Sequence, residues 1–402
     1  MAAESVRAEV GQIAPLDGLR GLAVAWVIAF HANVLRGKVG DPWVDLLASS
    51  RWLEPVVGSG FLGVDLFFLI SGFLLALPWF VHAKEGRSAP SARGFYWRRV
   101  RRIVPAYYVH LVVLFVVVLP LLRGIHYWRS DLYVYLYNAF AHALFLHDTT
   151  PLTSGSMEVN GALWTLAVEA QFYLLMPLLV PLFVRWTHAA VAASLALAVL
   201  WHLAVATGLD RLVAAEMALG AHWGWPESIV RYLLLHQLPS YLAHFAIGIV
   251  LGRAWLAWRS RPQPRIERLL LAIGALCALA VLYRSIAIDG RLLGDLSWLV
   301  APICLGILLF WAITTEWTPV QRALSRGPLA FLGRVSYSAY LYHLPLLLLW
   351  NAYARPLPAW LSLPIYLATL LAISWLSWRF VERPFLGKMV SGTTFRGAES
   401  RT

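Results

Sequence analysis

Long runs of apolar residues alternate with short polar segments along almost the whole chain. A helix needs about 20 predominantly apolar residues to cross the roughly 30 Å hydrocarbon core of a bilayer. Runs of this kind lie at 16–36, 60–82, 103–122, 162–184, 189–207, 231–255, 268–287, 296–314, 335–352 and 361–382. This pattern predicts an all-α integral membrane protein, a bundle of about ten transmembrane helices.

Two segments need separate interpretation. The segment 131–148 is too short and too polar for a membrane span, so an interfacial or re-entrant piece is the alternative that we favour. The first run is longer than the apolar core of a signal peptide and has no small-residue cleavage site, so we interpret it as an uncleaved first span.

Composition and charge agree with a membrane protein. The chain of 402 residues is 60% hydrophobic and 13% charged, whereas a soluble domain carries roughly 25% charged residues. The net charge of +12 comes from short basic clusters between apolar runs, so a nucleic-acid partner is excluded and the lipid bilayer is the expected surroundings. Because loops rich in Lys and Arg stay in the cytoplasm, we expect cytoplasmic tails at 1–15 and 385–402 around a transmembrane domain at 16–384.

Two ionisable residues share the first span, LDGLRGLAVAWVIAFHANVL. Such groups are costly inside a bilayer, so Arg20 and His31 are both candidates for function. They are separated by about three helical turns, or roughly 16 Å, and therefore lie on one face of the helix. The alternative for His31 is a packed histidine bonded to a neighbouring carbonyl.

The fourth span contains Glu169 at a depth similar to that of His31. A carboxylate beside an imidazole would fix its tautomer and raise its basicity, as a general base requires. We therefore expect Glu169 and His31 to meet across a helix interface. The alternative is that Glu169 neutralises an arginine and stabilises the bundle.

Four arginines precede the third span in YWRRVRRIVPAYY. Arg98 and Arg101 form one i,i+3 pair, and Arg99 and Arg102 form a second pair that faces another way. Guanidinium pairs of this kind suit bidentate binding of phosphate. The alternative is a topology anchor attracted to anionic lipid.

Six segments together resemble the membrane acyltransferase family 3, multi-pass enzymes that move acyl groups from acyl-CoA to hydroxyls of sugars and other metabolites. In the order of that family, they are LDGLRGL…H, GVDLFFLISGFLL, RRVRRIVPAYY, LWTLAVEAQFYLLMP, SYSAYLYHLPLL and ERPF. The resemblance implies functional roles for Arg20, His31, Arg98, Arg101 and Glu169. Some members carry an additional soluble hydrolase-like domain, whereas this chain ends soon after Phe385, so we expect the chemistry in the membrane part.

Residues and resemblance together predict an O-acyltransferase of the plasma membrane. Arg20, Arg98 and Arg101 would hold the phosphates of acyl-CoA, with acetyl as the expected acyl group. His31, oriented by Glu169, would deprotonate a hydroxyl of a carbohydrate, glycolipid or secondary metabolite for attack on the thioester. Neither a metal nor a permanently bound cofactor is needed, and a transient acyl group on His31 stays open.

The rival class is a transporter or proton-coupled carrier, because intramembrane His, Glu and Asp also form proton relays. Many transporters are built from paired inverted halves. No such halves are evident in this sequence, which favours the acyltransferase interpretation.

Overall fold

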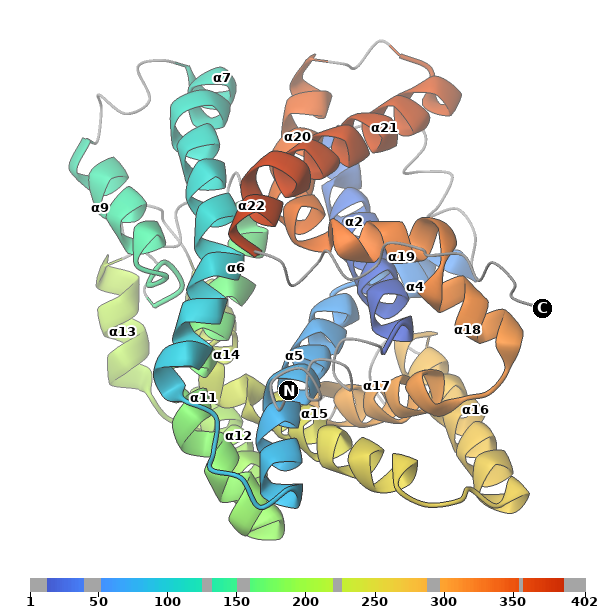
Figure 1. Cartoon of the computed structure of the whole chain (residues 1–402). Coiled ribbons are helices and arrows are strands. Elements are labelled where there is room, and N and C mark those ends of the chain that lie inside the picture. Colours follow the sequence, from blue (N-terminus) through green and yellow to red (C-terminus); the bar gives the residue numbers. More distant parts are fainter. Residues whose placement is uncertain are drawn as a thin grey trace.

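The computed structural model describes residues 13–39, 52–124, 132–149, 160–219, 226–287, 297–353 and 357–386. Within these ranges all regular elements are helical (Figure 1), so the all-α part of the predicted fold class is confirmed. The first half contains α2 (Pro15–Val39), α4 (Leu53–Gly58), α5 (Leu62–Lys84), α6 (Ala92–Val113), the π-helical η1 (Leu114–Val118), α7 (Leu119–Arg123), α9 (Leu132–Ala143), the 3-10 helix η3 (Gly161–Leu163), α11 (Trp164–Arg185) and α12 (Thr187–Thr207).

The second half continues the all-helical pattern. It contains α13 (Asp210–Leu219), α14 (Glu227–Leu235), α15 (Leu238–Arg259), α16 (Arg265–Ala287), α17 (Ser297–Thr314), α18 (Thr318–Ser325), α19 (Gly327–Arg334), α20 (Ser336–Tyr353), α21 (Ala359–Ser377), the π-helical η6 (Trp378–Glu382) and α22 (Arg383–Leu386). Nearly all of the two predicted tails lies outside the described residues.

Eight helical segments in the described part of the chain are long and apolar enough to cross a membrane. They match the first seven predicted spans and the tenth. The eighth predicted span corresponds to α17, which meets α18 at a bend of 100° and gives a ninth crossing if the pair counts as one broken span. The ninth predicted span is helix α20, but its tyrosines, His343 and Asn351 keep it below the apolarity of a membrane span.

The chain is therefore a multi-pass membrane protein with eight or nine apolar spans in its described part, and the count of ten is not established. The third span begins at Ala92, earlier than predicted, so the arginine cluster belongs to the helix itself. At 12 residues, α9 is too short to cross, as the interpretation of 131–148 anticipated. The cytoplasmic location of both termini stays a prediction.

Glycines bring α5 and α15 into backbone contact at the centre of the bundle. A Cβ atom built on Gly72 would lie 2.4 Å from the carbonyl oxygen of Phe245, and one built on Gly248 would lie 2.2 Å from that of Leu69. Only glycine permits an approach this close. Small residues are common at such contacts between membrane helices. The pair forms one rigid support, and α5 carries Ser71 next to this contact.

Helix α2 is held in the same way against α18 and α19. A Cβ atom on Gly18 would meet the carbonyl oxygen of Leu324 at 2.2 Å, and one on Gly333 would meet that of Asp17 at 1.7 Å. The glycines of LDGLRGL therefore fix the helix that carries Arg20 and His31.

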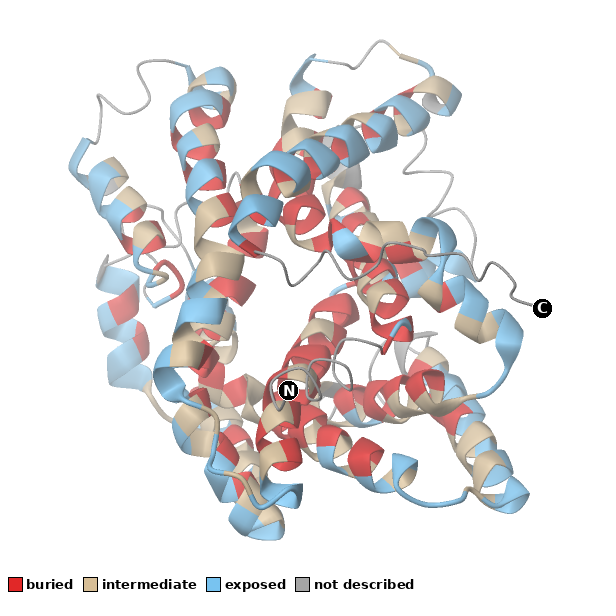
Figure 2. Cartoon of the chain, viewed as in Figure 1, coloured by how far each residue is buried: buried red, intermediate tan, exposed pale blue. Residues whose placement is uncertain are grey.

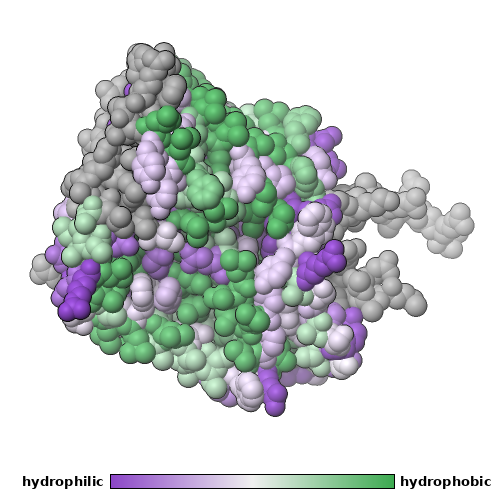
Figure 3. Space-filling view, turned by 90° about the vertical axis from the view of Figure 1, so that its left-hand side faces the viewer, coloured by the Kyte–Doolittle hydropathy of each residue, from purple (hydrophilic) through white to green (hydrophobic). Residues whose placement is uncertain are grey.

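Buried residues concentrate on the inner helices, including α2, α5, α15 and α20, whereas α13 and α16 expose most of their outer faces (Figure 2). The outer surface is rich in large apolar side chains, such as Val112, Val116 and Leu178, each more than half exposed. Figure 3 shows hydrophobic side chains over large parts of one face of the molecule. Such a surface is stable in lipid rather than in water.

A proline in α20 ties this helix to the segment that precedes α11. Pro345 has no amide hydrogen, so the carbonyl oxygen of Leu341 lacks its usual helical donor. The side-chain amide of Asn160 donates to that oxygen at 3.1 Å, and its nitrogen also lies 2.9 Å from Nε2 of His110. Asn160 is almost completely buried, so a side chain satisfies a carbonyl that water does not reach.

Candidate active site

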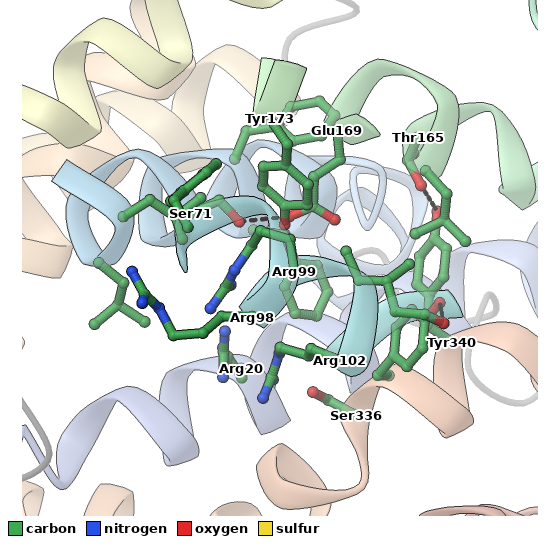
Figure 4. A pocket seen from close by; sticks show the side chains of 18 of the residues that line it. Arg20, Ser71, Arg98, Arg99, Arg102, Thr165, Glu169, Tyr173, Ser336 and Tyr340 are labelled. Carbon is green, nitrogen blue, oxygen red and sulfur yellow. Dashed lines mark hydrogen bonds between the residues drawn. The ribbon is translucent and has the colours of Figure 1, made fainter. Parts of the chain in front are cut away.

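A cavity of about 380 Å³ opens among α2, α5, α6, α11 and α20 (Figure 4). Its walls combine apolar and aromatic side chains with a concentration of charge. The charged and hydroxyl-bearing residues that line it are Arg20, Ser71, Arg98, Arg99, Arg102, Thr165, Glu169, Tyr173, Ser336, Tyr337 and Tyr340. Convergent polar groups in a concave, largely apolar site are the usual signature of a ligand-binding pocket.

Four arginines give the cavity its charge. Helix α6 starts at an N-cap in which Ser91 accepts a hydrogen bond from the amide of Gly94, and it contributes three of them. Their guanidinium groups lie together with that of α2 in Figure 4. The four are Arg20 from α2 and Arg98, Arg99 and Arg102 from α6.

The cavity can be compared with the predicted pair of Arg98 and Arg101, whose role in donor binding stays a prediction. At 100° per residue, Arg98, Arg99 and Arg102 fall within one 100° sector of the helix, whereas Arg101 lies 60° beyond Arg98 on the other side. The cavity lining accordingly includes the first three and leaves out Arg101. Of the predicted pair, only Arg98 faces the cavity.

Glu169 of α11 lies among these cations. Its Oε1 accepts a hydrogen bond of 2.6 Å from Ser71 Oγ, and the Tyr173 side chain lies next to its carboxylate (Figure 4). The guanidinium of Arg99 lies 6.0 Å from the centre of the Tyr173 ring. A carboxylate in this position can serve as a counter-charge for arginine, which is the alternative given above, and the role of Glu169 toward His31 stays a prediction.

His31 lies elsewhere, against α20. Its Nδ1 is 3.1 Å from Nε2 of His343 and 3.0 Å from the carbonyl oxygen of Val27. The expected contact with Glu169 is not formed, because Glu169 turns toward α5 and α6 while His31 turns toward α20. The rise of a helix gives the depth of a residue but not the direction in which it points, so equal depth was not enough.

Tyr340 lies between the arginine-lined cavity and the pair formed by His31 and His343. It lines the cavity, and its ring centre lies 5.5 Å from that of His343. Its hydroxyl lies 2.7 Å from the Thr165 hydroxyl and donates to the carbonyl oxygen of Ala162 at 2.7 Å. The histidine pair therefore adjoins the wall of the cavity that Tyr340 forms.

A second buried polar contact involves Asp65 of α5, whose Oδ1 lies 3.4 Å from Nε2 of His244 on α15. Both side chains are buried at the α5–α15 contact, outside the cavity lining. The side chains that were not among the predicted site residues are Arg99, Arg102, Tyr173 and His343. A signal existed for His343, because it is an intramembrane histidine in the motif SYSAYLYHLPLL.

These features define a multi-pass membrane protein whose bundle encloses an arginine-lined cavity beside a histidine pair. A family profile described as an acyltransferase domain matches residues 13–379. The chain belongs to this acyltransferase family, and the resemblance seen in its motifs is confirmed.

Relatives carry the same assignment. The peptidoglycan O-acetyltransferase OatA of Listeria monocytogenes is 27% identical over 381 residues, which cover 92% of this chain and 55% of the relative. The putative peptidoglycan O-acetyltransferase YrhL of Bacillus subtilis is 28% identical over 398 residues, covering 92% and 54%. The chain thus spans about half the length of the curated relatives it matches. No solved structure matches the chain.

Proposed function

We propose that the chain is an integral membrane O-acyltransferase that moves an acyl group, acetyl in the first instance, from acyl-CoA to a hydroxyl. The observation that carries the proposal is the convergence of Arg20, Arg98, Arg99 and Arg102 on one cavity in a chain of the acyltransferase family. Membership of that family does not favour the transporter alternative.

The donor would be bound by charge. CoA carries several phosphate groups, and the guanidinium fork of arginine pairs with phosphate oxygens through charge-assisted hydrogen bonds. Glu169, held by its hydrogen bond from Ser71, would offset part of the repulsion among the arginines. The apolar part of the cavity would accept the slender arm of the cofactor, with the thioester toward Tyr340.

The reaction needs one base. His31 would take the proton of the acceptor hydroxyl while its oxygen attacks the thioester carbonyl. The carbon–sulfur bond then breaks, and the departing thiolate receives the proton from the imidazolium. Holding the hydroxyl and the thioester in alignment inside the bundle, away from water, would accelerate the reaction further.

The acceptor is a hydroxyl-bearing carbohydrate, glycolipid or secondary metabolite. Two relatives are named for the O-acetylation of peptidoglycan, so a cell-wall glycan is the first acceptor to test. His31→Ala should reduce acyl transfer by at least the 10²–10⁴-fold that is typical of general base catalysis. A folded variant that transfers acyl groups at the parental rate would remove His31 from the mechanism.

Donor binding is tested separately. In the purified protein, Arg99→Ala combined with Arg102→Ala should weaken acetyl-CoA binding by about 10–150-fold for each arginine that no longer pairs with a phosphate. Arg93→Ala combined with Arg101→Ala is the matched control, because it removes the same two charges from the same helix outside the cavity. If both variants bind acetyl-CoA equally well, the arginines serve only as a topology anchor.

A further inference from the structure

The contact between His31 and His343 determines which nitrogen of each ring carries a proton. We infer that His343 is a positioning residue, which holds His31 as the tautomer with a basic Nε2 and stabilises it once it is protonated. The inference rests on the proposed function, in which His31 is the base.

The tautomer of His343 follows from its carbonyl partners. Its Nδ1 lies 2.7 Å from the carbonyl oxygen of Tyr340 and is also hydrogen-bonded to that of Ala339. A carbonyl oxygen can only accept, so Nδ1 of His343 must carry hydrogen. In a neutral imidazole the other nitrogen is then an acceptor. Nε2 of His343 therefore presents a lone pair to its neighbour.

The tautomer of His31 follows in turn. Its Nδ1 faces two acceptors, Nε2 of His343 at 3.1 Å and the carbonyl oxygen of Val27 at 3.0 Å. Nδ1 of His31 is therefore the donor, and its Nε2 carries the lone pair. The nitrogen available to a hydroxyl is Nε2, on the opposite edge of the ring from His343.

The same bond becomes stronger during the reaction. When Nε2 of His31 takes the hydroxyl proton, the ring becomes an imidazolium and its Nδ1–H bond to His343 becomes charge-assisted. His343 is held for this task, because it is fully buried and its backbone carbonyl accepts a hydrogen bond of 3.0 Å from the Tyr366 hydroxyl. Removing it should thus affect the protonated state of His31 more than donor binding.

A spectroscopic experiment tests the pairing without any need for activity. In lipid-embedded protein labelled with ¹⁵N-histidine, we expect both rings as Nδ1–H tautomers and a scalar coupling between Nδ1 of His31 and Nε2 of His343. His31→Ala and His343→Ala assign the signals among the 12 histidines. An Nε2–H tautomer for His31, or no coupling between the rings, would overturn the inference.

A kinetic experiment tests the role. His343→Phe keeps the ring shape without an acceptor and should lower kcat by about 10–150-fold, the range for a lost hydrogen bond to a charged group, with KM for acetyl-CoA unchanged. His343→Gln offers an amide oxygen to Nδ1 of His31 and should recover most of that loss. His202→Phe is the matched control, since the hydrogen bond of His202 in the described part of the chain is to Ala198 of its own helix, and its ring stacks on Trp298.

Different results would refute the proposed function and the positioning role of His343. A parent protein that shows the coupling but transfers no acyl group would refute the proposed function. An active parent without the coupling, or a folded His343→Phe variant with parental kcat, would refute the positioning role. A Phe variant whose KM rises while kcat is unchanged would also refute it, because that pattern indicates a structural effect on donor binding.

Discussion

Replacing Gly248 by alanine should push α15 away from α5, one of the helices that line the cavity. The new Cβ would lie 2.2 Å from the carbonyl oxygen of Leu69, whereas ordinary contacts begin at 3.4 Å. Helices α5 and α15 would have to move apart by roughly 1 Å, because the obstructing atom belongs to the backbone and cannot rotate away. Overpacking of this kind costs about 1–3 kcal/mol of the free energy of unfolding.

Unfolding in mixed micelles, followed by circular dichroism, measures that cost. Gly274→Ala on α16 is the matched control, since nothing lies within 4 Å of its built Cβ. Alanine favours helix over glycine by up to about 1 kcal/mol, so the control should be as stable as the parent or slightly more stable.

The displacement should also reach the site. Ser71 lies on α5 beside Gly72 and donates to Glu169 at 2.6 Å, so a shift of α5 should weaken acetyl-CoA binding in the variant that still folds. Equal stability of Gly248→Ala and Gly274→Ala would refute the close backbone contact and the rigid support that we derive from it.

Two further predictions concern buried polar groups. Asn160→Ala leaves the carbonyl oxygen of Leu341 without a donor and should cost about 1–3 kcal/mol, measured by the same unfolding assay; parental stability would contradict the assignment. Burial raises the pKa of the Asp148 carboxyl well above its ordinary value. The free energy of unfolding should therefore fall as the pH rises from the ordinary pKa of an aspartate toward the raised one. Asp148→Asn should therefore stabilise the protein at pH 7 but not in strong acid, unlike the exposed control Asp210→Asn.

Helix positions were accessible from the sequence because hydropathy is a local property. Each apolar run of sufficient length had to become a helix, since an unpaired backbone is costly in lipid. The exception, α20, is instructive: Asn351 and His343 lower its apolarity, and neighbouring helices bury them. A helix enclosed by others need not be apolar.

The site was only partly accessible. The sequence indicated Arg20, Arg98, Glu169 and His31, but which of them meet depends on the rotation of each helix about its axis. That rotation is set by long-range packing, such as the glycine contacts of α2 with α18 and α19, and no single span encodes it. The cavity lining contains Arg102, whereas the prediction named Arg101. The two positions are one residue apart and therefore differ by 100° of rotation about the helix axis.

Helix α2 also keeps Arg20 and His31 at a fixed distance from each other. Arg20 and His31 stand on one continuous helix, about 16 Å apart along its axis, and backbone contacts on α18 and α19 prevent the helix from sliding. If Arg20 binds the phosphates of the donor and His31 is the base, as we propose, the donor must carry its reactive carbonyl at the end of a long arm. In an acyl phosphate the acyl group is bonded directly to the anion. Bound at Arg20, such a donor could not reach His31, so we expect the protein to reject it.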